Sequence, residues 1–159
     1  MCNLFLVSSE TADRLLEDPA TIYQTLDSLD ESDADLPLDK SWHGLQFLLT
    51  GQPVSGDPPL NFLTEGGTDV GNVDVGYGPA RMLNAMEVAA LHPALEAFSQ
   101  DDLEARFDPA AMKAADIYPM IWEDPPDDLK REYSEYLELL KAHVRRAASS
   151  NQALLITLR

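Results

Sequence analysis

The sequence predicts an α+β fold: a single compact, helix-rich domain over residues 1–159, with a small sheet that includes the N- and C-terminal strands. Two short apolar runs of strand length, residues 4–7 and 153–159, lie at opposite ends of the chain. Between them, apolar residues recur at helical spacing behind capping residues. The length of 159 residues is typical of one domain.

Capping residues and apolar spacing place the helices. The predicted helices begin at Ser9, Pro19, Ser41, Asn84, Ser99, Pro109 and Asp127 or Asp128. Asn84 is the clearest start, because Glu87 completes a capping box. Pro93 is predicted to bend or break the helix that follows. The last helix is long and keeps one apolar face from Leu129 to Val144.

Two segments that lack a regular apolar period are predicted to form loops and turns. Residues 27–39 are acidic and contain a proline, and we interpret them as an exposed loop. Residues 60–83 are rich in glycine with short apolar pieces between the glycines, which predicts turns and one or two short strands.

Negative charge is the strongest compositional feature, with 28 acidic residues against 11 basic ones and a net charge of −17. Such a chain repels nucleic-acid phosphates and anionic membrane surfaces, so neither is expected as a partner. No apolar run reaches the length of a membrane span, the N-terminus lacks a signal-peptide pattern, and one cysteine forms no internal disulfide. The sequence therefore predicts a cytoplasmic protein.

The basic residues are unevenly distributed along the chain. Residues 15–105 hold 17 of the acidic side chains but only two basic ones, Lys40 and Arg81. Basic residues that served solubility alone would be more evenly scattered. Their scarcity favours a specific role for these two.

Lys40 belongs to the motif DKSWHG, residues 39–44. Lys40 and His43 lie within one turn of a predicted helix start, where backbone N–H groups favour an anion, and His43 can carry protons near neutral pH. Trp42 is included in this candidate ligand site. In the structural alternative, Asp39 caps the helix, Trp42 anchors it in the core and His43 bonds a neighbouring backbone group.

Arg81 belongs to the motif VGYGPAR, residues 75–81. Gly76 and Gly78 allow a tight turn or a close approach to a ligand, and Tyr77 between them is a candidate ligand contact. Arg81 offers a planar fork to a carboxylate or phosphate. The motif lacks the ending of a phosphate-binding loop. In the structural alternative, Arg81 pairs with a nearby acid beside a glycine turn.

Three further features have weaker functional interpretations. Removal of the first methionine would give Cys2 both a thiol and a free amine, but a half-buried residue leading into a strand is the favoured interpretation. Tyr118 and Trp122 either line a pocket or pack a helix corner. The three histidines are far apart, so no metal site is predicted, and no cofactor is expected.

Three segments carry a resemblance to a known family: LDKSWHGLQFLLTG (38–51), GYGPARML (76–83) and LEARFDPAAMKAADIYPMIW (103–122). Together they resemble the YfbM-like family of small bacterial proteins, a domain of unknown function. The resemblance spans nearly the whole chain and implies a compact α/β domain, in keeping with the fold predicted from the residues. It implies no activity, cofactor or catalytic residue.

Two functions of different classes follow from the sequence. The first is a non-catalytic binding module whose acidic surface engages a basic protein partner, which the charge, the small size and the lack of a catalytic motif favour. The second is a site for an anionic small molecule, with or without catalysis. There Lys40 and Arg81 would hold the charge and His43 would act as general acid or base.

Overall fold

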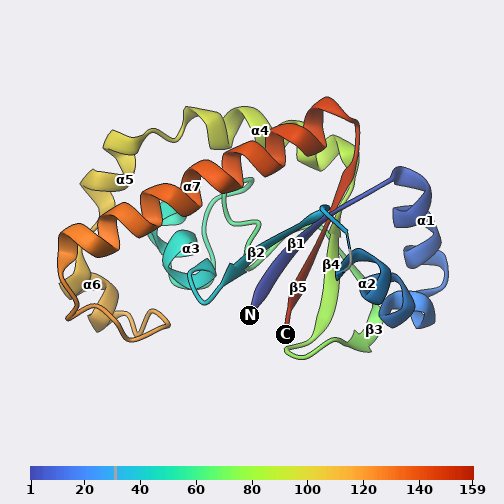
Figure 1. The fold of residues 1–159 in the computed structure, drawn as a ribbon, viewed down its shortest axis with the longest axis horizontal. Helices are drawn as coiled ribbons and strands as arrows, with labels where there is room; N and C mark the ends of the chain where they lie inside the picture. Colours follow the sequence, from blue (N-terminus) through green and yellow to red (C-terminus); the bar gives the residue numbers. More distant parts are fainter. Residues whose placement is uncertain (31) are drawn as a thin grey trace.

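The computed structural model describes residues 1–30 and 32–159, which form a five-stranded antiparallel sheet with helices on both faces (Figure 1). The strands are β1 (Cys2–Val7), β2 (Asp35–Asp39), β3 (Thr68–Asp74), β4 (Pro79–Leu83) and β5 (Ala153–Leu158). The helical elements are α1 (Ser9–Glu17), the 3-10 turn η1 (Pro19–Thr21), α2 (Ile22–Asp30), α3 (Trp42–Thr50), α4 (Ala85–Ala97), α5 (Gln100–Arg106), α6 (Pro109–Ala114) and α7 (Pro126–Ser149). The predicted α+β class is confirmed.

The terminal strands lie side by side in the middle of the sheet, whose order is β2-β1-β5-β4-β3. β1 and β5 pair antiparallel along their whole length, from Cys2 opposite Leu158 to Val7 opposite Ala153. The Arg159 N–H donates to the Met1 carbonyl at 2.8 Å, so the two ends of the chain meet (Figure 1). The predicted pairing of the N- and C-terminal strands in one sheet is confirmed.

Two separate cores explain why the central strands are apolar at nearly every position. Side chains alternate across a strand, so Leu4 and Leu6 face the core formed with α3, α4 and α7. Phe5 and Val7 face the opposite core, formed with α1 and α2. A strand covered on both faces excludes polar residues from its interior positions, which is why the sequence shows an unbroken apolar run there.

The prediction of an exposed loop over residues 27–39 is wrong for most of that segment. α2 continues to Asp30, and Asp35–Asp39 form the edge strand β2, while residue 31 lies outside the described residues. Leu36 and Leu38 are buried and alternate with exposed Pro37. An edge strand tolerates proline because one of its sides needs no N–H donor. Two apolar residues in an acidic run are too few to show this period in the sequence.

Helix starts are confirmed at most predicted positions; the exceptions are α1 and α7, and α7 begins at Pro126 behind Pro125 rather than at Asp127 or Asp128. Ser8 rather than Ser9 caps α1, accepting a hydrogen bond from the Thr11 N–H at 3.1 Å. Pro93 does not end α4, which continues to Ala97. The capping box of Asn84 and Glu87 at the start of α4 is present as predicted.

α7 is 24 residues long and runs across most of the molecule (Figure 1). Its acidic residues all precede Lys141 and its last nine residues carry only basic charges, the order that the helix dipole favours. Its apolar face packs into the larger core through residues from Leu129 to Ala147. Among the described residues, α7 and the other helices are all too short or too polar to cross a bilayer.

The close approach of α3 to α7 depends on a glycine. A β-carbon at position 44 would lie 2.3 Å from the Tyr133 Oη and 2.5 Å from its Cζ. Tyr133 is fully buried and stacks on Trp122 with ring centroids 5.7 Å apart. Gly44 therefore lets α3 press onto α7, and this contact fixes the start of α3 where Trp42 lies.

Buried His143 on α7 gives a testable pH dependence of stability. Burial lowers the pKa of His143 from 6.5 to about 4. The positive charge of Arg146 adds to this effect, and a hydrogen bond with the Leu4 backbone opposes it. Below pH 6.5 the unfolded chain takes up a proton that the folded chain excludes, so the free energy of unfolding falls as the pH drops towards 4. At pH 5 the loss should reach about 2 kcal/mol. Urea unfolding at pH 7 and pH 5 measures it, and His143→Leu should remove most of this loss; an unchanged loss in the variant would contradict the assignment.

Candidate functional site

A pocket lies beside the meeting point of the two chain ends. It has a volume of about 350 Å³ and is lined by Met1, Trp42, Tyr77, Tyr118 and Leu158. We call it the aromatic pocket. Its three aromatic residues come from the start of α3, the β3–β4 hairpin and the loop after α6, so only the folded chain brings them together. Tyr77 is 80% exposed, which leaves its ring available to a ligand.

The β3–β4 hairpin holds Tyr77 in place. Asp74 Oδ1 accepts hydrogen bonds from the backbone N–H groups of Gly76 and Gly78, at 2.8 and 2.9 Å. The Tyr77 N–H donates to the Leu158 carbonyl at 2.9 Å and ties the hairpin to β5. Gly76 has a φ of 145°, and a β-carbon there would lie 2.8 Å from the backbone after β5. The glycines of this motif therefore make a tight turn.

His43 joins the α3 side of the pocket to the Tyr118 side. Its Nδ1 accepts a hydrogen bond from the Tyr118 N–H at 3.0 Å, and its ring stacks on Trp42 with centroids 4.9 Å apart. Burial lowers the pKa of His43, partly offset by the backbone of Pro53, so the imidazole is neutral at pH 7. His43 therefore makes a hydrogen bond to a backbone group, as the structural alternative for the DKSWHG motif expects. Trp42 is half-buried; it packs against the larger core, as the structural alternative expects, and it also lines the pocket.

Arg81 holds a turn of the chain against β4. Its Nη1 donates to the Gly66 carbonyl at 2.9 Å, and its Nη2 donates to the carbonyls of Phe62 and Leu63 at 3.0 and 2.8 Å. Burial lowers the pKa of Arg81, but a guanidinium remains charged at neutral pH. The hydrogen bonds of Arg81 to the described residues thus go to backbone carbonyls, whereas the sequence suggests a ligand anion or an acidic side chain.

A second hollow adjoins the aromatic pocket, and we call it the polar hollow. It has a volume of about 210 Å³ and includes Thr64, Asp69 and Arg81 in its lining. Tyr77 and Leu158 line both spaces. The two hollows together therefore offer an aromatic part and a charged part on either side of Tyr77.

The five candidate residues from the sequence fall into different surroundings. Trp42 and Tyr77 line one pocket, Arg81 lines the adjoining hollow, and His43 lies behind Trp42. Lys40 is exposed in the turn before α3 and has no hydrogen bond or ion pair with any described residue. A shared anion site of Lys40, His43 and Arg81 therefore stays a prediction without a contact that brings the three together.

The aromatic group of residues 118–122 divides between pocket and core. Tyr118 is 45% exposed and lines the aromatic pocket. Trp122 is 5% exposed, and its Nε1–H donates to the Ile117 carbonyl at 2.6 Å in the core. The sequence places Tyr118 and Trp122 together after one helix. It does not show which of the two rings faces outward, because both lie in the same irregular segment.

Cys2 is not placed for nucleophilic chemistry, and within residues 1–30 and 32–159 the acidic side chains do not form a metal-ligand group. Cys2 is fully buried in β1, and burial raises the pKa of its thiol to about 12, so the thiol is protonated and inaccessible. In the same part of the chain, no group of three or more His, Cys, Asp or Glu residues is placed to hold a metal ion.

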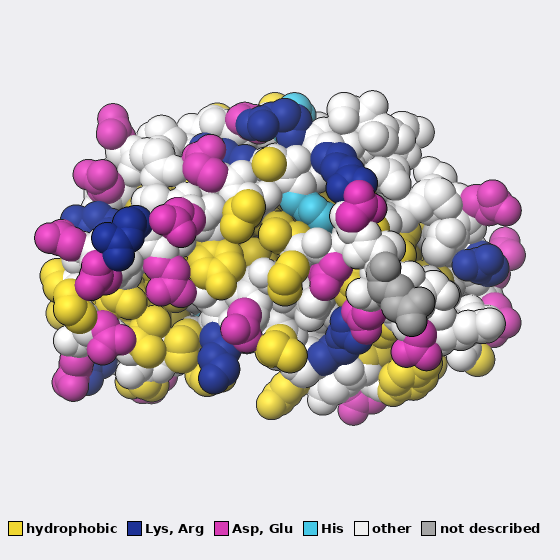
Figure 2. Space-filling view, viewed as in Figure 1, with side chains coloured by type: hydrophobic (Ala, Val, Ile, Leu, Met, Phe, Trp, Pro, Cys, Tyr) yellow, Lys and Arg dark blue, Asp and Glu magenta, His cyan; other side chains and the backbone are white. Residues whose placement is uncertain are grey.

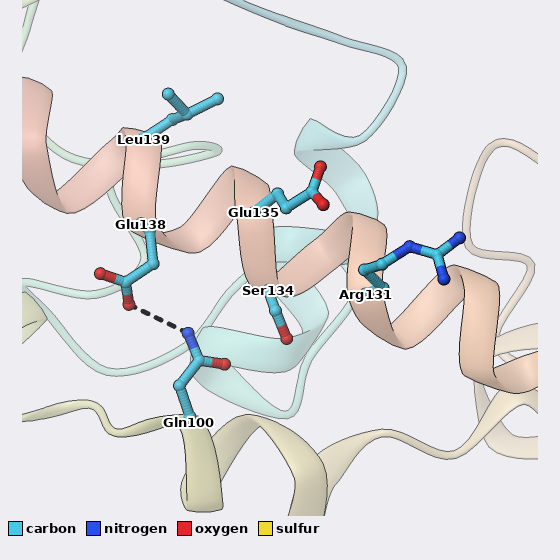
Figure 3. A pocket seen from close by; sticks show the side chains of 6 residues that line it. All are labelled: Gln100, Arg131, Ser134, Glu135, Glu138 and Leu139. Carbon is cyan, nitrogen blue, oxygen red and sulfur yellow. Dashed lines mark hydrogen bonds between the residues drawn. The ribbon is translucent and has the colours of Figure 1, made fainter.

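A broader hollow of about 580 Å³ lies along the exposed side of α7, with Gln100 of α5 on its border (Figure 3). Its residues on α7 follow helical spacing, and we call them the α7 outer face: Arg131, Ser134, Glu135, Glu138 and Leu139. Gln100 Nε2 donates to Glu138 Oε1 at 2.9 Å, which links α5 to this face (Figure 3). Leu139 is 52% exposed, so an apolar side chain lies beside two glutamates.

Comparisons with known proteins identify relatives of unknown function. A family model described as "Domain of unknown function (DUF1877)" matches residues 1–157. A crystal structure of YfbM from Escherichia coli, itself a protein of unknown function, is similar with 25% identity and a TM-score of 0.77, covering 98% of this chain and 97% of that one. No curated protein matches the chain.

Proposed function

This chain belongs to the DUF1877 family, a domain of unknown function, and we propose that it is a non-catalytic binding module that docks a basic protein partner on the α7 outer face. The observation that carries the proposal is the pairing of exposed Leu139 with Glu135 and Glu138 in one hollow. This combination joins an apolar contact to negative charge. The resemblance to YfbM concerns the fold and brings no function with it.

The charge around this face favours a basic partner. Residues 100–106 and 126–140 carry eight acidic and three basic side chains. Figure 2 shows several acidic side chains, with Lys and Arg side chains between them, at the end of the molecule formed by α5, α6 and the start of α7. Exposed charges of one sign raise the rate at which an oppositely charged partner arrives.

The three basic side chains of this region are engaged within the protein. Arg106 Nη1 donates to the carbonyls of Leu48 and Leu49, at 3.0 and 2.5 Å. Arg131 pairs with Asp128 at 2.8 Å, and Lys130 lies 5.7 Å from the Phe107 ring centroid. These contacts hold the cations near their own partners. On the α7 outer face, Glu138 accepts from Gln100 and lies 3.7 Å from Lys141 Nζ, whereas Glu135 makes no hydrogen bond or ion pair with the described residues and is the freer carboxylate for a cation of another protein.

The chemistry of the face defines the partner. A segment with Lys or Arg on both sides of one apolar residue would place its apolar residue on Leu139 and its cations near Glu135 and Glu138. The exposed charges would supply rate and specificity, and the apolar contact would supply affinity. We include a cytoplasmic location in this proposal, because the one cysteine is buried and reduced.

A charge-reversal experiment tests the proposal with a basic amphipathic peptide as the probe. Fluorescence anisotropy at low and high salt should show binding by the wild type that weakens with salt, since exposed charges are screened within ~10 Å at about 0.1 M. Glu135→Lys combined with Glu138→Lys should weaken binding roughly tenfold at low salt.

The matched control is Asp13→Lys combined with Glu17→Lys on α1, two exposed acids on the other side of the sheet. This variant changes the net charge equally and should bind within about twofold of the wild type. Equal losses in both variants would show that net charge alone attracts the peptide, and would contradict a specific surface on α7.

A further inference from the structure

The aromatic pocket and the polar hollow make a site separate from the α7 outer face, with no residue in common. We propose that these two hollows together bind a free α-amino acid with a large apolar side chain. The side chain would occupy the aromatic pocket, and the ammonium and carboxylate would occupy the polar hollow. Tyr77 and Leu158 line both spaces, so one small molecule that passes Tyr77 reaches both.

The aromatic pocket fits a flat or bulky apolar group. Its lining consists of three aromatic residues, Met1 and Leu158, and its volume of about 350 Å³ is at the lower end for small-molecule sites. Met1 also carries the N-terminal ammonium. This group donates a hydrogen bond to the Arg159 carbonyl. An aromatic ring of a ligand would bind favourably there, through stacking or edge-to-face contacts with the Trp and Tyr rings.

The polar hollow fits a head group with both charges. Asp69 and Arg81 are register partners on β3 and β4, so their side chains lie on the same face of the sheet. The Asp69 carboxylate is exposed and makes no hydrogen bond or ion pair with the described residues. Arg81 has five N–H donors, of which its three carbonyl contacts leave Nε and one on Nη1.

A ligand with a single charge fits this pair of groups less well. An ammonium alone would approach Asp69 but also the Arg81 guanidinium, and a carboxylate alone would meet the Asp69 carboxylate. A zwitterion places each charge beside its opposite and leaves neither group facing a like charge. The same reasoning distinguishes a free amino acid from a peptide terminus, which carries only one of the two charges.

Three probes with the same phenyl ring test the proposal: L-phenylalanine, L-phenylalaninamide, which lacks the carboxylate, and N-acetyl-L-phenylalanine, which lacks the ammonium. Their rings do not absorb at the long-wavelength edge of tryptophan absorption, so excitation there reports binding through a change in the protein's fluorescence, to which half-buried Trp42 and buried Trp122 both contribute. We expect L-phenylalanine to bind about tenfold more tightly than either single-charge probe.

Variants locate the two halves of the site. Tyr77→Ala removes an exposed ring without disturbing the core, and Asp69→Asn removes only a charge; each should weaken L-phenylalanine binding by about fivefold or more. Asp69→Asn should also narrow the preference for L-phenylalanine over N-acetyl-L-phenylalanine. Met86→Ala, at an 83% exposed residue on α4, is the control and should bind normally.

Several results would overturn the proposal. These are no binding of L-phenylalanine, equal affinity for the three probes, or unchanged binding in Tyr77→Ala. Tighter binding of one single-charge probe than of L-phenylalanine would indicate that the site binds a peptide terminus and not a free amino acid. None of these results depends on whether a basic protein docks on α7, because the two sites have no residue in common.

Discussion

Gly44→Ala is expected to lower the free energy of unfolding by about 3 kcal/mol. Alanine normally stabilises a helix interior relative to glycine by roughly 0.5–1 kcal/mol, so the predicted sign is opposite to the helix propensity. The cause is the contact of α3 with α7, where the new methyl group would lie 2.3 Å from the Tyr133 Oη. Tyr133 is fully buried and stacks on Trp122, so moving its ring would disturb the packing of the core. Urea unfolding of the two proteins at pH 7 measures the difference.

Gly51→Ala is the matched control for this substitution. Gly51 ends α3 with a φ of 75°, and a β-carbon there would meet nothing within 4 Å. Its replacement should cost only the backbone strain of a left-handed residue, about 1 kcal/mol. A stability of Gly44→Ala equal to or above the wild type would mean that α3 does not pack on α7 as described.

Arg81→Ala is expected to lower the free energy of unfolding by about 3 kcal/mol. The substitution removes a charged donor from the carbonyls of Phe62, Leu63 and Gly66, two of which belong to buried residues. Buried acceptors that lose their partner carry most of the cost. Thermal and urea unfolding both measure it.

Lys40→Ala gives the comparison, because Lys40 is the other basic residue in 15–105 and is exposed. Its removal should change the free energy of unfolding by no more than about 0.5 kcal/mol. Similar effects of the two substitutions would contradict the structural role of Arg81. A ligand anion that stabilised the wild type and required both residues would instead support their predicted partnership.

Much of the fold could be predicted because its signals are local. The buried parts of the two terminal strands, residues 4–7 and 153–156, are continuous apolar runs, and the capping box at Asn84 is complete within four residues. The strand β2 escaped prediction because its period rests on Leu36 and Leu38 alone, within an acidic segment. Its pairing with β1 is a long-range contact that short-range patterns do not record.

The candidate site was predictable only in part. Trp42 and Tyr77, two of the predicted ligand contacts, line one pocket, but their meeting with Tyr118 depends on three segments far apart in sequence. The role of Arg81 depends on carbonyls 15 to 19 residues earlier, which every residue type possesses and which no pattern marks. Glu135 and Glu138 have the spacing of any solvated helix face, so nothing in the sequence separated them from the other acids.

The proposed docking surface on α7 is tested most directly by an amide NMR titration of the wild-type protein with the basic peptide. Binding at the α7 outer face predicts that the largest shift changes gather at Gln100 and at residues 134–139, and that salt reduces them together. Shift changes that gather around Trp42, Tyr77 and Tyr118, or that spread evenly over the acidic surface, would contradict docking on α7.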